Sequence, residues 1–172
     1  MFRDWSEFYL LAGSAAAVLI GLVFVVVTLM QDRPRSSVLN GSKLYMGPVV
    51  LHMSFVLVLS GAALVPNIGG RQFAAVAWII ALWGLARGLY STVGLVRLWT
   101  PTNEVHWTDI WYYGVIPSAL YIGMGVVAIG FWSAAGWAAD GIAAVITALI
   151  LLSIRDEYDL VTWLAPKRDD ES

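Results

Sequence analysis

The chain has 172 residues, of which 59% are hydrophobic and only 13% are charged, with a formal net charge of −2. A soluble domain carries about twice that share of charged residues, so the composition is that of a membrane protein. The absence of cysteine excludes disulfides, thiolate nucleophiles and cysteine-ligated metal clusters, and no basic run supports nucleic acid as a partner.

Five long apolar stretches follow one another along the chain. Each is long enough to cross a bilayer, because the hydrocarbon core is about 30 Å thick and a helix rises about 1.5 Å per residue. We therefore predict an all-α polytopic membrane protein, a single transmembrane domain over residues 1–172 built as a five-helix bundle. The predicted spans are Phe8–Met30, Met46–Pro66, Phe73–Val96, Tyr112–Phe131 and Ala138–Ile154.

The first stretch, Phe8–Met30, is interpreted as a retained span rather than a secretory signal. It is longer than a typical signal h-region, its leader contains Asp4 and Glu7, and no small-residue cleavage site follows it.

Lysine and arginine are distributed unevenly between the two predicted faces. Arg87 lies inside a span, Arg3 and Arg71 lie on one face, and the seven others lie on the opposite face, which holds the C-terminus. Cytoplasmic loops are enriched in these residues. The pattern predicts that the N-terminus is outside and the C-terminus is cytoplasmic. The seven residues are Arg33, Arg35, Lys43, Arg97, Arg155, Lys167 and Arg168.

The residues after the fifth span, Arg155–Leu164, continue with helical spacing. Ile154, Tyr158 and Val161 share one stripe of this segment, which predicts a short amphipathic helix at the cytoplasmic interface. Its charged residues are interpreted as a solvated face. In the alternative interpretation, Arg155, Glu157 and Tyr158 form a docking surface for a cytoplasmic partner.

Small residues recur four positions apart in three of the spans. Such spacing lets two helix backbones approach closely in a membrane, where van der Waals packing drives association. The candidate packing residues are Gly13 and Gly21 in span one and Gly84 and Gly88 in span three; Thr92, Gly114 and Ser118 extend the pattern. The sequence leaves open whether these contacts form within one chain or between copies.

Two prolines fall near the predicted starts of spans two and four. Pro48 and Pro117 are interpreted as helix-start prolines, and kinks beside a cavity are the alternative.

Two ionisable residues, His52 and Arg87, fall at membrane depth. Counted from the centres of their spans, His52 lies about 6 Å and Arg87 about 4.5 Å toward the cytoplasmic side. Ionisable groups are costly in lipid and are therefore functional candidates. Ser91 shares the helical stripe of Arg87. Arg87 has three open interpretations: snorkelling to the headgroups, a structural ion pair, or an anion site. His52 is either a packing residue or a second pathway residue.

No catalytic constellation is visible in the sequence. There is no H-E-x-x-H motif and no pair of intramembrane aspartates. Glu104 and His106 are only two potential metal ligands, and we expect neither a metal nor another cofactor.

Two parts of the chain resemble the sequences of known membrane proteins. Residues 5–9 (WSEFY) with 13–25 (GSAAAVLIGLVFV), and Ile154-Arg155 with Tyr158-Asp159-Leu160, resemble a group of small uncharacterised bacterial inner-membrane proteins. Some of that group are labelled modulators of a membrane-bound AAA protease. The resemblance implies a bacterial inner membrane.

Two functions follow as hypotheses. The first is a self-associating pore or carrier for an anion or small solute, with Arg87, His52 and Ser91 along its pathway. The second is a non-catalytic accessory or regulatory subunit of a larger membrane complex, docked through Arg155–Leu164. A membrane enzyme is a third alternative, with no reacting constellation to support it. The expected partners are the lipid bilayer and either further copies of the chain or a larger complex.

Overall fold

The computed structural model describes residues 2–29, 47–98 and 107–164. Helices account for 92% of these residues, and no strand occurs among them. Five of the helical segments are long and apolar enough to cross a membrane, which confirms the all-α class and the number of helices. The elements are η1 (Arg3–Trp5), α1 (Ser6–Leu29), α3 (Gly47–Leu64), α4 (Gly70–Leu98), α5 (Trp107–Ile110), η3 (Trp111–Val115), α6 (Ile116–Trp132) and α7 (Ala138–Leu164).

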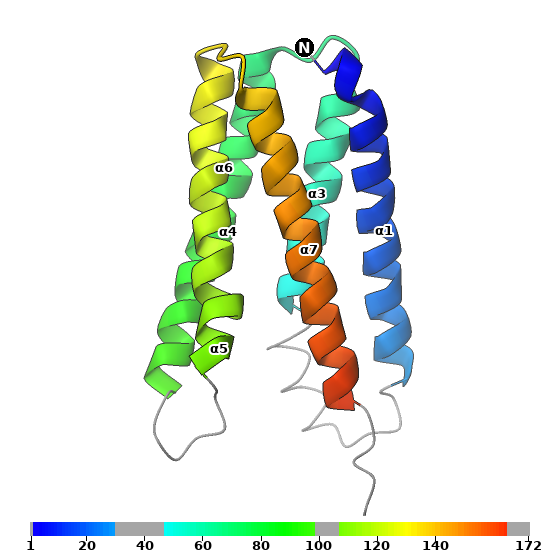
Figure 1. Cartoon of the computed structure of the whole chain (residues 1–172), viewed down its shortest axis with the longest axis vertical. Coiled ribbons are helices and arrows are strands. Elements are labelled where there is room, and N and C mark those ends of the chain that lie inside the picture. The colour runs from blue at the N-terminus through cyan, green and yellow to red at the C-terminus, as the bar shows by residue number, and fades with distance from the viewer. Residues whose placement is uncertain (1, 30–46, 99–106, 165–172) are drawn as a thin grey trace, which may run out of the picture.

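Successive long helices run in opposite directions along the bundle (Figure 1). The N-terminus and the connections 65–69 and 133–137 lie at one end, called here the N-terminal end. Helices α1, α4 and α7 finish at the opposite end, where α3 and α5 begin. The segments α5, η3 and α6 follow without a break and together form the fourth long helix. The start of α1 and the end of α7 therefore lie at opposite ends.

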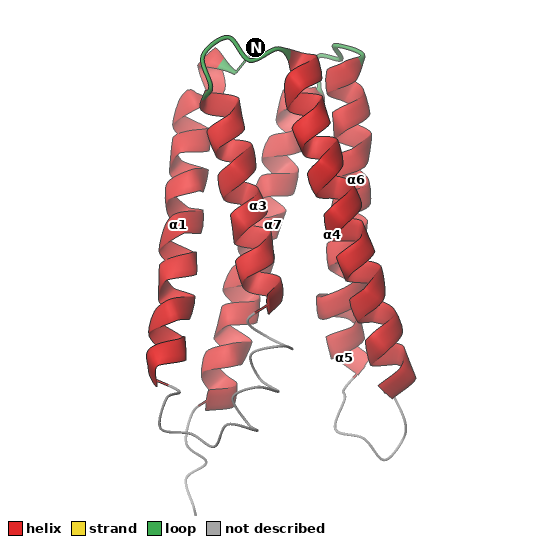
Figure 2. Cartoon of the chain, turned by 180° about the vertical axis from the view of Figure 1, so that it is seen from behind, coloured by secondary structure: helices red, strands yellow, loops and turns green. Residues whose placement is uncertain are grey.

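The helices pack as two pairs with a fifth helix between them. Helix α1 packs on α3, α4 packs on α6, and α7 contacts α1, α3 and α6. Figure 2 shows the bundle from the side opposite to Figure 1. Helices α3 and α4 are in contact, as expected from their short connection, but both views show them spreading apart toward the opposite end.

An aromatic cluster closes the N-terminal end of the bundle. The ring of Phe2 lies 4.7 Å from that of Phe73 on α4 and 5.4 Å from that of Phe131 on α6, measured between centroids. Tyr9 of α1 meets Phe2 edge-on at 5.4 Å. Tilted and edge-to-face pairs of this kind are favourable. The cluster joins the two helix pairs at this end.

Helices α4 and α6 approach closely along two stripes of small residues. A Cβ atom added at Gly88 would lie 2.6 Å from the Oγ atom of Ser118, so the contact has room only for glycine. The stripes predicted on spans three and four thus face each other within one chain. The facing pairs are Gly84 with Tyr121, Gly88 with Ser118, and Thr92 with Gly114.

The two packing candidates of α1 have different surroundings. A Cβ atom at Gly13 would lie 3.2 Å from the Cβ atom of Ser60 on α3, so Gly13 belongs to the α1–α3 contact. No described atom lies within 4 Å of the corresponding position at Gly21, which is exposed. Gly21 therefore takes no part in packing within the described chain.

The C-terminal segment differs from its prediction. Residues 155–164 are helical, as predicted, but they extend α7 without interruption rather than forming a helix of their own. No glycine or proline occurs between Gly141 and Leu164 to end the helix. Ser153 and Asp156 are fully buried against the bundle, which keeps this part of α7 in place. The predicted loop and tail cations Arg33, Arg35, Lys43, Lys167 and Arg168 lie outside the described residues.

Candidate functional site

A cleft of about 550 Å³ lies between the beginning of α3 and the second half of α4. Helix α3 contributes its first turn and a half, from Gly47 to His52, and α4 contributes one face from Gly84 to Leu95. Tyr113 and Pro117 line it from the fourth long helix. The cleft therefore occupies the half of the bundle that the aromatic cluster does not close.

The face of α4 along the cleft explains why the space is empty. Gly84, Gly88, Ser91 and Gly94 all line the cleft and bring little or no side chain into it. No described atom lies within 4 Å of the position that a Cβ atom would take at Gly94. The small residues that let α4 approach α6 thus also leave room between α4 and α3.

The two prolines flank the cleft in different ways. Pro48 lies in the first turn of α3, as a helix-start proline should. Pro117 is the second residue of α6, but α6 continues directly from the π-helical turn η3. Proline lacks an N–H group and its ring clashes with the carbonyl four residues earlier, here that of Tyr113, and the wider π-turn accommodates both. Pro117 therefore fits both predicted interpretations, a helix start and an irregularity beside a cavity.

His52 is buried and joins α3 to α6. Its Nδ1 atom lies 2.6 Å from the hydroxyl oxygen of Tyr121, and only 4% of the residue is exposed. Its Nε2 atom has no hydrogen-bond partner in the described part of the chain. In the tautomer that accepts the Tyr121 proton at Nδ1, Nε2 carries hydrogen and is a donor. His52 lines the cleft, but its Nε2 atom is buried.

Arg87 is exposed and lines the same cleft. Its guanidinium carbon lies 5.9 Å from the ring centroid of Tyr90, one helical turn further along α4. Within residues 2–29, 47–98 and 107–164, ion pairs involve Arg155 and none involves Arg87. The ion-pair interpretation of Arg87 therefore has no support from the described residues, whereas snorkelling and anion binding both require an accessible guanidinium.

The structure places the three predicted pathway residues around one space. Arg87 and Ser91 come from α4, and His52 comes from α3. The cleft thus brings one cation and the hydroxyl group of Ser91 into mostly apolar surroundings, an arrangement that can hold an anion. The sequence did not single out Tyr113 or Tyr121, although Tyr121 follows the Gly114–Ser118 stripe at helical spacing. Tyr121 is buried against α3 and α4.

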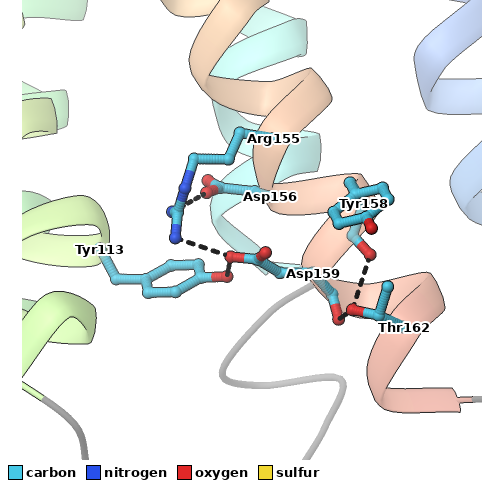
Figure 3. A network of polar contacts seen from close by, with 6 residues as sticks. All are labelled: Tyr113, Arg155, Asp156, Tyr158, Asp159 and Thr162. Carbon is cyan, nitrogen blue, oxygen red and sulfur yellow. Dashed lines mark hydrogen bonds and ion pairs between the residues drawn. The ribbon is translucent and has the colours of Figure 1, made fainter.

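A second polar cluster joins α7 to η3 at the opposite end (Figure 3). Arg155 forms an ion pair with Asp159 at 2.9 Å and a longer one with Asp156 at 3.5 Å. Tyr113 donates a hydrogen bond to Asp159 at 3.4 Å, and the Arg155 guanidinium lies 3.3 Å from the ring centroid of Tyr112. The contacts of the Arg155 guanidinium are thus with residues of the same chain.

The other two docking candidates differ in their exposure. Tyr158 is 68% exposed, and Glu157 is half-buried with no partner for its Oε1 atom among the described residues. No group of three or more histidine, aspartate or glutamate side chains in the described ranges is arranged to hold a metal ion. The weak metal candidates Glu104 and His106 lie outside these ranges.

No family model, curated protein or solved structure matches the chain. Similarity to known proteins therefore assigns no function to the cleft, and its chemistry has to follow from its residues.

Proposed function

We propose that the protein is a self-associating carrier or pore for an anion or small solute in a bacterial inner membrane, and that the α3–α4 cleft is its binding site. One observation carries the proposal: Arg87, His52 and Ser91, which come from two helices, line a single cleft of about 550 Å³. The charge pattern of the sequence supports a cytoplasmic C-terminus, which puts the cleft in the cytoplasmic half of the membrane.

The electrostatics of the cleft favour an anion over a cation. Two opposite unit charges about 4 Å apart attract by about 4 kcal/mol at an effective dielectric constant near 20, against about 1 kcal/mol in water. Arg87 has no ion-pair partner among the described residues to offset its charge. The hydroxyl group of Ser91, which also lines the cleft, supplies a further hydrogen bond to a bound anion.

Anion flux through liposomes tests the proposal. Wild-type protein should transport or bind chloride or a small organic anion, and Arg87→Gln should reduce this activity at least about tenfold, the equivalent of about 1.4 kcal/mol. Arg87→Lys should keep part of the activity because the charge remains. Arg97→Gln is the matched control, since Arg97 is an exposed arginine of the same helix that does not line the cleft.

An absence of anion-dependent flux and binding in well-folded wild-type protein would contradict the proposal. The alternative, an accessory subunit of a larger complex, is supported by the exposure of Tyr158 and Val161 at the end of α7. Isolation from native lipid separates the two hypotheses, because a carrier should be recovered as a homomer and an accessory subunit with a partner.

A further inference from the structure

We infer that the ligand of the cleft is an anion with an apolar body, of the class of medium-chain carboxylates. This inference rests on the proposed anion site and narrows the ligand that the site accepts.

The size and walls of the cleft do not suit an inorganic anion. Its volume of about 550 Å³ lies within the range of pockets for organic ligands, about 300–1,000 Å³, and far exceeds chloride or phosphate. Leu51, Leu95 and Pro117 give it apolar walls, and among the described residues Arg87 is the one charged side chain that lines it. A strongly hydrated anion would exchange its water for too few polar groups there. The apolar part of an organic anion, in contrast, is stabilised when it leaves water for these apolar walls.

Arg87 supplies the donors that a carboxylate needs. A carboxylate has two oxygens that accept hydrogen bonds, and the arginine fork presents paired donors to them. The Arg87 side chain is exposed and has no ion-pair partner among the described residues, so its guanidinium is available to a ligand.

The open part of the cleft extends from these groups along α4. Gly94 lies seven residues after Arg87, about 10 Å along the helix. The space at Gly94 is free of described atoms within 4 Å, so an alkyl chain has room beside it. Arg87 and Tyr90 are exposed while lining the cleft, so the cleft opens on the surface of the bundle.

A chain-length series tests the inference. Binding of acetate, butyrate and octanoate is measured by equilibrium dialysis to the full chain in zwitterionic nanodiscs, with binding to empty nanodiscs subtracted. Affinity should rise up to about fourfold for each methylene group buried. Octanoate should saturate one class of site, and octanol, with the same tail but no charge, should bind more weakly. Arg87→Gln should weaken octanoate at least about tenfold and leave octanol unchanged.

Filling the cleft provides a second, independent test. Gly94→Leu should abolish the increase in affinity from acetate to octanoate while acetate still binds. Gly94→Ala should reduce that increase in part. Gly123→Leu is the matched control, because Gly123 also has no described atom within 4 Å of its Cβ position but does not line the cleft. Melting curves and elution profiles should be unchanged in all three variants.

The outcomes separate this inference from the proposed function. Equal, Arg87-dependent affinities for acetate and octanoate would overturn the inference and leave the anion site standing. Octanoate binding that neither Arg87→Gln nor Gly94→Leu changes would be partition into lipid and would also overturn it. An absence of binding by every anion tested would overturn both.

Discussion

The Nδ1 atom of His52 lies 2.6 Å from the hydroxyl oxygen of Tyr121, in a buried hydrogen bond between α3 and α6. The ring of Tyr121 lies directly against Gly84 of α4. This side chain therefore extends from α6 and contacts both α3 and α4, the other two helices that border the cleft. Phe55 of α3 packs edge-on against the same ring at 5.9 Å. The position of Tyr121 therefore determines how far α3 and α4 can separate.

Removing the Tyr121 hydroxyl group should destabilise the bundle. Tyr121→Phe leaves the Nδ1 atom of buried His52 without its partner, and interhelical hydrogen bonds in membranes contribute about 0.5–2 kcal/mol. The free energy of unfolding in mixed micelles should fall by about that amount. Tyr90→Phe is the control, since Tyr90 is 75% exposed, and it should change the free energy little. Equal effects of the two substitutions would show that the His52–Tyr121 bond contributes nothing.

A methyl group added at Gly84 should lower the free energy of unfolding, whereas one added at Gly21 should leave it unchanged or raise it. Alanine is favoured over glycine in a helix by about 1 kcal/mol, so Gly21→Ala, with no described atom nearby, should be neutral or stabilising. At Gly84 the methyl group would overlap the ring of Tyr121, and overpacking of this kind costs about 1–3 kcal/mol. Unfolding in mixed micelles measures both. A stabilised Gly84→Ala variant would show that α4 and α6 do not pack as closely as described.

The number of helices and the faces on which α4 and α6 pack closely could be predicted because each depends on one physical quantity. Bilayer thickness sets the length of a crossing helix, so apolar length alone identified five segments. Small residues four apart identified faces that can approach closely, and Gly88 and Ser118 do meet. The common depth of His52 and Arg87 followed from counting residues along two antiparallel helices.

The cleft itself depends on how three helices pack against one another. No local sequence pattern predicts that packing. Arg87 and His52 line the same space only because Tyr121 and Gly84 fix α4 and α6 against α3. The extension of α7 was missed for a related reason. An amphipathic segment has the same periodicity whether it lies at an interface or continues a span, and only the burial of Asp156 distinguishes the two.

Arg155 should stabilise the end of α7 through its ion pair with Asp159. The two side chains lie 2.9 Å apart and are partly exposed, and the Arg155 guanidinium also lies over the ring of Tyr112. Because a partly exposed i,i+4 pair contributes about 0.3–0.5 kcal/mol and a cation–π contact about 0.5–1 kcal/mol, Arg155→Gln should lower the unfolding free energy by about 1 kcal/mol. The double variant Arg155→Gln/Asp159→Asn should lose less than the sum of the two single losses. Additive losses would contradict this role.

The two ends of the bundle should lie on opposite sides of the membrane. Ser6 and Gly136 are exposed at the N-terminal end, and Thr162 is exposed near the end of α7, so cysteines introduced there report on both sides. The native chain has no cysteine to give background labelling. In intact cells a membrane-impermeant maleimide should label Ser6→Cys and Gly136→Cys, and it should label Thr162→Cys only after permeabilisation, because arginine and lysine gather on that face. The reverse pattern would keep five crossings and overturn the orientation. Labelling of Ser6→Cys and Thr162→Cys from the same side would mean that the number of crossings is even.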